Sequence, residues 1–563
     1  MTVWQLRTKI AKLLNRRVNR EIEPDEIFLD SANLPRFDTH QLEGRIERPI
    51  GKWSVTALAL VFLVASVGFG TKLYALQIRS GETYAALSEE NRLRHSLIFA
   101  ERGVIYDRNQ VELAWNEPGA DFPLRRYASI PGIAHVVGYL GYPLADASGR
   151  YYRERYEGRA GAEESLDAEL AGVNGLKIVE TDAHGEVQSE SVLKPPENGR
   201  SVLLSIDSRL SKVFYESIAQ VSESVGFSGG TGIMMDVRTG EIIALASYPE
   251  FNSSLMVNGG AADIQRALSD VRKPFLNRSV SGLYTPGSIV KLFIAAGALE
   301  ERVVSPEKKI LSTGALSLPN PFDPERPSIF KDWRAHGWVD LRHALAVSSN
   351  VYFFQVGGGY ENQRGLGIAG IERSVRAFGI GEETGVDLSG EEIGTVPNPA
   401  WKRDNFEDGT WRIGDTYNTA IGQYGFQVTP VSIVRAVAAI ANDGILFTPT
   451  IRLGGGAGVE RVPTSPENLE IVREGMRLAV TEGTARALNL PALAVAGKTG
   501  TAELGYTKQF VNSWSVGFFP YERPAYAFAF LMEHGPVQNL TGASAVASRV
   551  FSWMFANMPE YVE

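Results

Sequence analysis

The most restrictive feature of this sequence is an uncharged, mostly apolar run from Ser54 to Thr71. A helix needs about 20 such residues to cross the roughly 30 Å hydrocarbon core of a bilayer, and the apolar residues up to Leu76 extend the run to that length. Trp53 and Tyr74 lie at its two ends, where interfacial aromatic residues are common. We therefore predict a transmembrane helix over residues 54–76, preceded by a tail formed by residues 1–53.

The orientation of this helix follows from the charges before it. Arg45, Arg48 and Lys52 precede the apolar run, and positive residues favour the cytoplasmic side, so the N-terminal tail is expected inside and the bulk of the chain outside. A cleaved signal peptide is the alternative, but some fifty residues before the run are many for such a peptide. In the tail, Met1–Arg20 has apolar and basic residues at helical spacing, which fits a helix on a membrane surface or a solvated helix packed elsewhere.

Composition excludes several classes of function. The chain of 563 residues is long enough for two or three domains, and its formal net charge of −9 argues against a nucleic-acid partner. The absence of cysteine excludes disulfides, thiolate metal sites and a cysteine nucleophile. The seven histidines form no recognised metal motif. We therefore expect no cofactor and no required metal.

Residues 77–225 have a mixed, turn-rich pattern without an obvious catalytic pair, which predicts a β-rich, non-catalytic pedestal outside the membrane. Strands are expected at His135–Leu140 and Ser201–Ile206, and helices at Gly161–Leu170 and Ser208–Val221.

Residues 226–563 have strand patterns at both ends and helices between them. Thr231–Asp236 and Glu241–Ser247 read as a hairpin, and the later strands are Leu493–Ala502, Ser513–Phe519 and Ala525–Met532. The expected helices are Ser288–Glu300, Leu341–Phe354, Ile371–Phe378, Pro430–Asn442 and Ser544–Phe555. This order predicts an α+β domain with one sheet built from both ends and helices on its faces.

A candidate nucleophile lies in the segment Tyr284–Lys291, where a Pro-Gly turn opens a helix. Ser288 and Lys291 are three residues apart, so they share one helical face. A hydroxyl beside an amine is the minimal arrangement for an activated serine, and the unpaired N–H groups of a helix start favour developing negative charge. The S-x-x-K pattern alone is frequent by chance.

Two later motifs strengthen this candidate. Ser348-Ser349-Asn350 has the pattern S-x-N, and Lys498-Thr499-Gly500-Thr501 has the pattern K-T-G-T. Each is common alone, but their occurrence in this order within one domain is far less frequent by chance.

The three motifs resemble those of the penicillin-recognising serine acyltransferases, that is, penicillin-binding proteins and serine β-lactamases. The resemblance covers nearly everything after Lys72. Arg102-Gly103 and Gly161-Ala162-Glu163 resemble the membrane-proximal, dimerisation-type pedestal of class B penicillin-binding proteins. Trp411–Thr416 and Gly422-Gln423 look more like the elongation-type enzyme, penicillin-binding protein 2, than the septal one.

The resemblance implies an antiparallel sheet flanked by helices and a role for each motif residue. Ser288 would be the nucleophile and Lys291 its general base, with Ser348 as proton relay. Asn350 would hold Lys291 and the substrate amide, and Lys498 would attract the donor's carboxylate and lower the pKa of Lys291 by repulsion. Thr499, Gly500 and Thr501 would bind substrate, and the N–H groups of Ser288 and Thr501 would form the oxyanion hole.

The implied reaction is D,D-transpeptidation at the bacterial cytoplasmic (inner) membrane. The partners would be peptidoglycan stem peptides ending in D-Ala-D-Ala, β-lactam antibiotics, a SEDS-type glycan polymerase and other elongation-complex proteins. Alternatives remain open: a septal transpeptidase, a D,D-carboxypeptidase that uses water as acceptor, a β-lactamase or β-lactam sensor, and a non-catalytic scaffold.

Overall fold

The structure is a computed structural model that describes residues 51–84, 93–147, 149–181, 187–320, 323, 325–456, 458–505, 507–539 and 541–562. The chain divides into two units, Met1–Asn91 and Arg92–Glu563, each of which is considered by itself. The helix expected at Met1–Arg20 and most of the 1–53 tail lie outside the described residues.

The first unit contains the predicted apolar helix, α2 (Lys52–Tyr74), followed by a turn of π-helix, η4 (Ala75–Arg79). With a rise of 1.5 Å per residue, α2 is about 35 Å long, which is sufficient for a hydrocarbon core. The hydroxyls of Thr56 and Thr71 donate to the carbonyls of Lys52 (2.8 Å) and Val67 (2.9 Å), so both are paired within the helix. Among the described residues only this helix has the length and composition of a membrane span, which fits a single membrane anchor.

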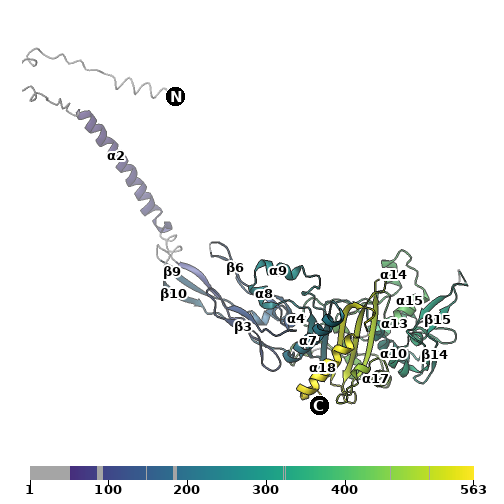
Figure 1. Cartoon of the computed structure of the whole chain (residues 1–563). Coiled ribbons are helices and arrows are strands. Elements are labelled where there is room, and N and C mark those ends of the chain that lie inside the picture. The colour runs from purple at the N-terminus through teal and green to yellow at the C-terminus, as the bar shows by residue number, and fades with distance from the viewer. Residues whose placement is uncertain are drawn as a thin grey trace, which may run out of the picture. The chain divides into compact units, whose positions relative to one another are not determined.

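The second unit begins with two small sheets, in the strand orders β1-β9-β10 and β11-β2-β3-β4 (Figure 1). Two two-stranded sheets, β5–β8 and β6–β7, and three short helices, α4 to α6, complete this β-rich part within the described residues. The bounds are β1 Leu93–Ile98, β2 Ile105–Tyr106, β3 Glu112–Glu117, β4 Leu124–Tyr127, β5 Tyr139–Gly141, β6 Leu144–Ala145, β7 Tyr151–Arg153, β8 Glu157–Ala160, α5 Gly161–Ser165, α6 Asp167–Leu170, β9 Gly175–Thr181, β10 Val187–Lys194 and β11 Val202–Leu203.

A buried charge network joins segments of this region that are distant in sequence. The Glu163 carboxylate accepts from the guanidinium groups of Arg102 (2.5 Å) and Arg125 (2.7 Å), and none of the three side chains is exposed. Burial alone would raise the pKa of Glu163, but the two arginines lower it. Removal of one partner would leave an uncompensated buried charge, so this network explains why both segments carry these residues.

The strand expected at His135–Leu140 is wrong in its first half. Residues Ala134–Val137 form a short buried helix, α4, and only β5 (Tyr139–Gly141) is extended. A short apolar run fits a buried helical turn as well as a strand, and here Gly138 at φ 79° ends the helix.

The C-terminal sheet has the order β13-β12-β22-β21-β20, and all its neighbouring strands are antiparallel. It combines the first hairpin of the domain with its last three strands, so the predicted α+β architecture is confirmed. The strands are β12 Gly229–Asp236, β13 Ile242–Tyr248, β20 Ala496–Leu504, β21 Phe510–Phe519 and β22 Tyr526–Pro536.

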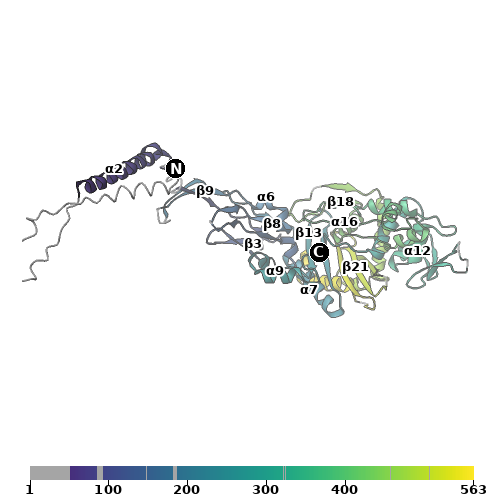
Figure 2. The same ribbon diagram turned by 90° about the horizontal axis from the view of Figure 1, so that it is seen from above.

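Helices cover both faces of this sheet (Figures 1 and 2). Successive residues of β22 point to opposite faces of the sheet. Phe528 and Phe530 pack with α7 (Ser208–Val225) and α18 (Ala543–Asn557) on one face. Ala529 lies on the other face, in the core under α16 (Pro430–Ala441). Because α7 packs on this sheet, the hydrophobic core of the C-terminal domain includes residues before the predicted border at 226.

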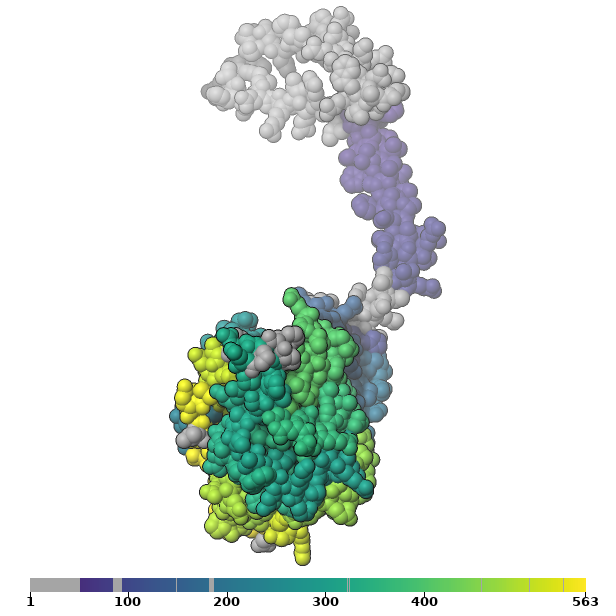
Figure 3. All heavy atoms as spheres, turned by 90° about the vertical axis from the view of Figure 1, so that its right-hand side faces the viewer, coloured from purple at the N-terminus to yellow at the C-terminus, as the bar shows by residue number. Residues whose placement is uncertain are grey.

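The remaining elements, apart from the C-terminal η7, lie between β13 and β20 in the sequence, and most of them form the face shown in teal and green in Figure 3. The helix expected over Leu341–Phe354 is wrong as one element, because two helices, α11 and α12, meet at a turn through Ser348. The bounds are α8 Ser253–Asn258, α9 Ala261–Leu268, η5 Gly287–Val290, α10 Lys291–Glu300, β14 Ile310–Ser312, β15 Ala315–Leu318, β16 Ser328–Lys331, β17 Gly337–Val339, α11 Leu341–Ala346, α12 Asn350–Gly358, α13 Gly367–Arg376, α14 Pro399–Asn405, α15 Ile413–Ala420, β18 Ile445–Phe447, β19 Val459–Arg461, α17 Pro466–Thr481, η6 Arg486–Leu488 and η7 Pro559–Tyr561.

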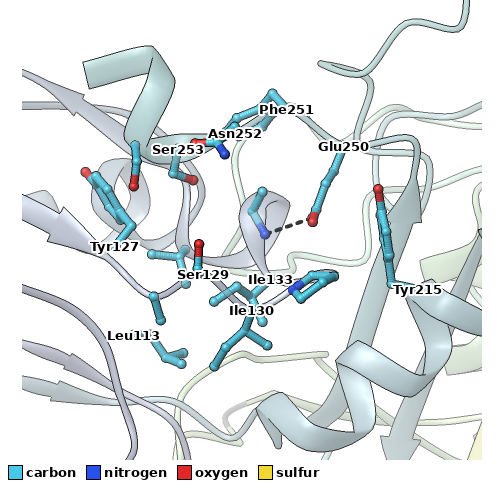
Figure 4. A pocket seen from close by; sticks show the side chains of 15 residues that line it. Leu113, Tyr127, Ser129, Ile130, Ile133, Tyr215, Glu250, Phe251, Asn252 and Ser253 are labelled. Carbon is cyan, nitrogen blue, oxygen red and sulfur yellow. Dashed lines mark hydrogen bonds between the residues drawn. The ribbon is translucent and has the colours of Figure 1, made fainter. Parts of the chain in front are cut away.

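Glu250 connects the C-terminal domain to the β-rich part. Its carboxylate accepts from the N–H groups of Gly132 (2.7 Å) and Ala134 (3.0 Å), at the start of α4. The contact borders a pocket of about 280 Å³ that is lined from both regions (Figure 4). Burial raises the pKa of Glu250 to about 7, although the two N–H groups favour the ionised form.

We expect Glu250 to make the stability of this unit depend on pH. Its folded-state pKa lies above the usual 4.5, so the folded state binds the proton more tightly than the unfolded state. The stability from this group is therefore largest below pH 4.5 and declines as the pH rises through 7, by up to about 3 kcal/mol. The melting temperature of the detergent-solubilised chain, measured from pH 4.5 to 8, should decline more steeply for the wild type than for Glu250→Gln.

The control is Glu223→Gln, which alters an exposed carboxylate that accepts from Tyr248. Parallel curves for wild type and Glu250→Gln would contradict the expectation.

Candidate active site

The candidate nucleophile lies on a 3₁₀ turn rather than on the first turn of an α-helix. Residues Gly287–Val290 form η5, and α10 begins at Lys291. With three residues per turn, Ser288 and Lys291 still share one face. Gly287 has φ 56°, and a Cβ atom there would lie 2.8 Å from the Thr501 carbonyl oxygen, so both conformation and space require glycine. This close approach places the Ser288 turn directly beside strand β20.

Lys291 is fully buried and faces the S-x-N motif. Its Nζ donates to the carbonyl oxygen of Ser348 (2.9 Å) and to Oδ1 of Asn350 (2.7 Å), and it lies 3.4 Å from Oγ of Ser348. The amine also lies 5.5 Å from the centre of the Phe353 ring. Lys291 is therefore held by both polar ends of the motif within an otherwise apolar surrounding.

Ser348 occupies the turn between α11 and α12 with φ 58°, a conformation that few non-glycine residues adopt. The turn is fixed on both sides: Ser349 caps α12 by accepting from the N–H of Tyr352 (3.3 Å), and Thr484 donates its N–H to the carbonyl of Ala346 (3.1 Å). This conformation presents both the carbonyl and the hydroxyl of Ser348 to Lys291.

The third element of the site is strand β20, which is an edge strand of the sheet. The other two are the segment with Ser288 and Lys291 and the turn with Ser348. Nζ of Lys498, which is also fully buried, donates to Oγ of Ser348 (2.9 Å) and to the carbonyl of Thr499 (2.8 Å). The Thr499 hydroxyl donates to Oγ1 of Thr484 (2.8 Å), and Thr501 is exposed. A Cβ on Gly500 would lie 2.8 Å from the Pro286 carbonyl oxygen, so the missing side chain lets the nucleophile turn pack on the strand.

Burial sets the charge of both lysines. It lowers the pKa of Lys291 to about 7, and the negative charge of Asp332 opposes this change. Burial also lowers the pKa of Lys498 well below its usual value, and the charge of Lys291 lowers it further. The repulsion predicted between the two lysines therefore acts on Lys498, and the site favours at least one neutral amine near pH 7.

The structure thus brings Lys291, Ser348, Asn350 and Lys498 into direct contact, from three separate elements. Ser288 lies on the adjoining turn, but its hydroxyl has no hydrogen-bond partner among the described residues. Catalytic contacts are often looser in an unliganded site, so this does not argue against its role. The sequence did not indicate Thr484 as a neighbour of Thr499. Nor did it indicate Asp332 as a neighbour of Ser349, because both contacts link separate segments of the chain.

No group of three or more His, Asp or Glu side chains that could hold a metal ion occurs in the described part of the chain. The expectation that the protein requires no metal remains a prediction.

Two family models match the chain. Residues 230–555 match the penicillin-binding protein transpeptidase domain, and residues 120–204 match the penicillin-binding protein dimerisation domain. A similar relative is peptidoglycan D,D-transpeptidase MrdA of Acinetobacter baumannii, with 32% identity over 452 residues; the match covers 75% of this chain and 64% of the relative.

Solved structures agree with these matches. A complex between penicillin-binding protein 2 (PBP2) and MreC from Helicobacter pylori contains a chain with a TM-score of 0.69 and 25% identity, covering 83% of this chain and 99% of that one. A peptidoglycan synthase complex that coordinates polymerisation and crosslinking contains a chain with a TM-score of 0.69 and 27% identity, covering 90% of this chain and 98% of that one.

Proposed function

Since this chain belongs to the penicillin-binding protein transpeptidase family, as its sequence motifs predict, we propose that it is a serine D,D-transpeptidase that crosslinks peptidoglycan. The observation that carries the proposal is the convergence of two buried lysines on Ser348, beside the turn that presents Ser288. In a chance S-x-x-K pattern the serine and the lysine lie on the protein surface, whereas here Lys291 is fully buried.

In the first step, Oγ of Ser288 attacks the carbonyl carbon between the two terminal D-alanines of a donor stem peptide. Lys291, as a neutral amine, takes the hydroxyl proton. The new ester bond replaces the amide bond, and the nitrogen of the released D-alanine receives a proton through Ser348. Because Ser348 contacts both lysines, it is suited to move this proton from one amine to the leaving group.

In the second step, the amine of a neighbouring stem attacks the ester carbonyl. The ester bond breaks as the crosslinking amide forms, and the proton lost by the amine returns to Oγ of Ser288. The N–H groups of Ser288 and Thr501 stabilise the oxyanion in both steps. In a β-strand the N–H and carbonyl of one residue point to the same side, and the Thr501 carbonyl lies next to Gly287.

The donor's terminal carboxylate is assigned to Lys498, Thr499 and Thr501. Burial and the charge of Lys291 lower the pKa of Lys498. An arriving carboxylate supplies the opposite charge and raises that pKa, so substrate binding would protonate Lys498 and leave Lys291 as the neutral amine. Asn350 would orient the substrate amide while it holds Lys291.

We assign the chain to cell-wall elongation at the cytoplasmic membrane, with its N-terminus inside and its catalytic domain outside. The charges before α2 support this orientation, and the similarity to MrdA and to PBP2 structures supports the elongation role. The proposed partners are a SEDS-type glycan polymerase and other elongation proteins, among them an MreC-like protein. This choice is supported by the two similar structures, one a complex of PBP2 with MreC and the other a peptidoglycan synthase complex.

Product analysis with a donor stem peptide and an amine acceptor tests the proposal on the detergent-solubilised full chain. We expect release of D-alanine together with a crosslinked dimer. Release of D-alanine with free tetrapeptide alone would identify a D,D-carboxypeptidase. Repeated hydrolysis of a β-lactam would identify a β-lactamase. If neither the stem peptide nor the β-lactam reacted, the protein would be a non-catalytic scaffold.

A further inference from the structure

A buried carboxylate lies behind the S-x-N motif. Asp332 follows strand β16, and its side chain has no exposed surface. One carboxylate oxygen accepts from the N–H of Val351 (2.9 Å) and from the hydroxyls of Ser349 (2.9 Å) and Ser312 (3.3 Å). The other accepts from the N–H of Trp333 (2.9 Å). Four donors around a buried carboxylate form a built site, and the catalytic steps above do not use it.

These hydrogen bonds fix the turn on which the catalytic contacts depend. Val351 and Ser349 flank Asn350, whose side chain holds Nζ of Lys291, and Ser349 follows Ser348, which both lysines contact. Ser348 has an unfavourable positive φ, so the turn needs outside contacts to keep its shape. Asp332 supplies two such contacts at the start of α12, from the Ser349 hydroxyl and the Val351 N–H.

The negative charge of Asp332 also acts on Lys291. Burial would raise its pKa, but the N–H groups of Val351 and Asn350, the Ser349 hydroxyl and Lys291 lower it, so the carboxylate is ionised. The charge of Asp332 raises the pKa of the Lys291 amine, against the effect of burial. His336 lies near the carboxylate, with Nε2 3.6 Å from it, and burial lowers the pKa of this histidine, which keeps it neutral. Asp332 is therefore the negative charge behind the motif that acts on Lys291.

We propose that Asp332 is a positioning residue for acyl transfer: its carboxylate holds the turn that carries Ser348 and Asn350, and it places a buried negative charge behind the motif that holds the Lys291 amine. This inference rests on the proposed role of Lys291 as general base. The two parts are separable, because a neutral isostere keeps the shape of Asp332 and removes its charge. Substitution of Ser349, in contrast, removes one of the hydrogen bonds and keeps the charge.

The test is the rate of covalent labelling by a fluorescent penicillin, measured from pH 5 to 9 on the solubilised full chain. The negative charge favours protonated Lys291, so its removal makes the amine neutral at lower pH. For Asp332→Asn we expect the acid limb of the rate profile to move down by roughly half a pH unit or more. We also expect the plateau to fall about tenfold, because the turn loses part of its support.

Two further variants separate charge from shape. Ser349→Ala should lower the plateau and leave the acid limb in place. Asp340→Asn removes another helix-capping carboxylate, which accepts from the N–H of His343 (2.9 Å), and should not move the limb. An acid limb at the wild-type pH in Asp332→Asn, whatever its plateau, overturns the proposal. A wild-type rate that changes with added zinc or chelator, while that of Asp332→Asn does not, overturns it in favour of a metal ligand. Absence of labelling in the wild type would instead reject the proposed function.

Discussion

Replacing Ser288 with alanine is expected to abolish covalent labelling by fluorescent penicillin and to leave the fold intact. The substitution removes only Oγ, the atom that would carry the acyl group. Within the described residues this hydroxyl has no hydrogen-bond partner, so its loss removes no contact of the folded chain. The thermal melting temperature should therefore remain within a degree or two of the wild-type value.

The matched control is Ser281→Ala, which removes the hydroxyl of a nearby serine that donates to the carbonyl of Gly390. It should be labelled at the wild-type rate. Labelling of a well-folded Ser288→Ala variant would show that another residue is the nucleophile, and the reading of S-x-x-K would then be wrong. Denaturing gel fluorescence of purified full-length protein is sufficient for both measurements.

Replacing Lys291 with methionine is expected to slow acylation roughly a thousandfold, the middle of the range for loss of a general base. Methionine fills much of the same buried volume beside Phe353 but cannot take a proton. The wild-type labelling rate should decline below about pH 7, because protonation of Lys291 removes the base. In Lys291→Met this acid limb should be absent.

Lys291→Arg distinguishes the base from a merely positive or hydrogen-bonding group. Arginine retains the charge and donors but does not lose its proton at any working pH. It should acylate as slowly as Lys291→Met. If Lys291→Arg retained rapid labelling with a normal acid limb, Lys291 would be a positioning group and not the base. Circular dichroism and thermal melting of both variants identify losses caused by unfolding.

The sheet was predictable from the sequence because its strands have local apolar patterns, as in Ala525–Met532. The three motifs were predicted to share one domain because Ser288, Ser348 and Lys498 lie between the first and last strands of that sheet. Serine and asparagine at Ser348–Asn350 favour helix caps and turns, but the apolar residues on both sides of them favoured one continuous helix, so the break at Ser348 was missed. The break is held by Asp332 and Thr484, which are distant in sequence, and only the tertiary structure shows these contacts.

The electrostatics of the site were predictable in kind but not in detail. The sequence led us to expect a lowered pKa for Lys291 from repulsion by Lys498. The structure gives burial as the main cause, adds Asp332 as an opposing charge and places the repulsion on Lys498. The sequence alone does not show that Asp332, sixteen residues before Ser348, is buried behind the motif. The short helix α4 was mistaken for a strand because a short apolar run fits either element.

The left-handed backbone of Ser348 limits how this protein could evolve under antibiotic selection. A β-branched residue such as threonine is strongly disfavoured at φ 58°, although it would preserve the hydroxyl. Glycine would relax the backbone but remove the proposed proton relay. Asparagine and aspartate adopt this conformation more readily than serine but lack a hydroxyl, so serine combines the hydroxyl with an unbranched side chain. Resistance substitutions should therefore accumulate around this position, on the exposed rim of the site, and leave the turn itself unchanged.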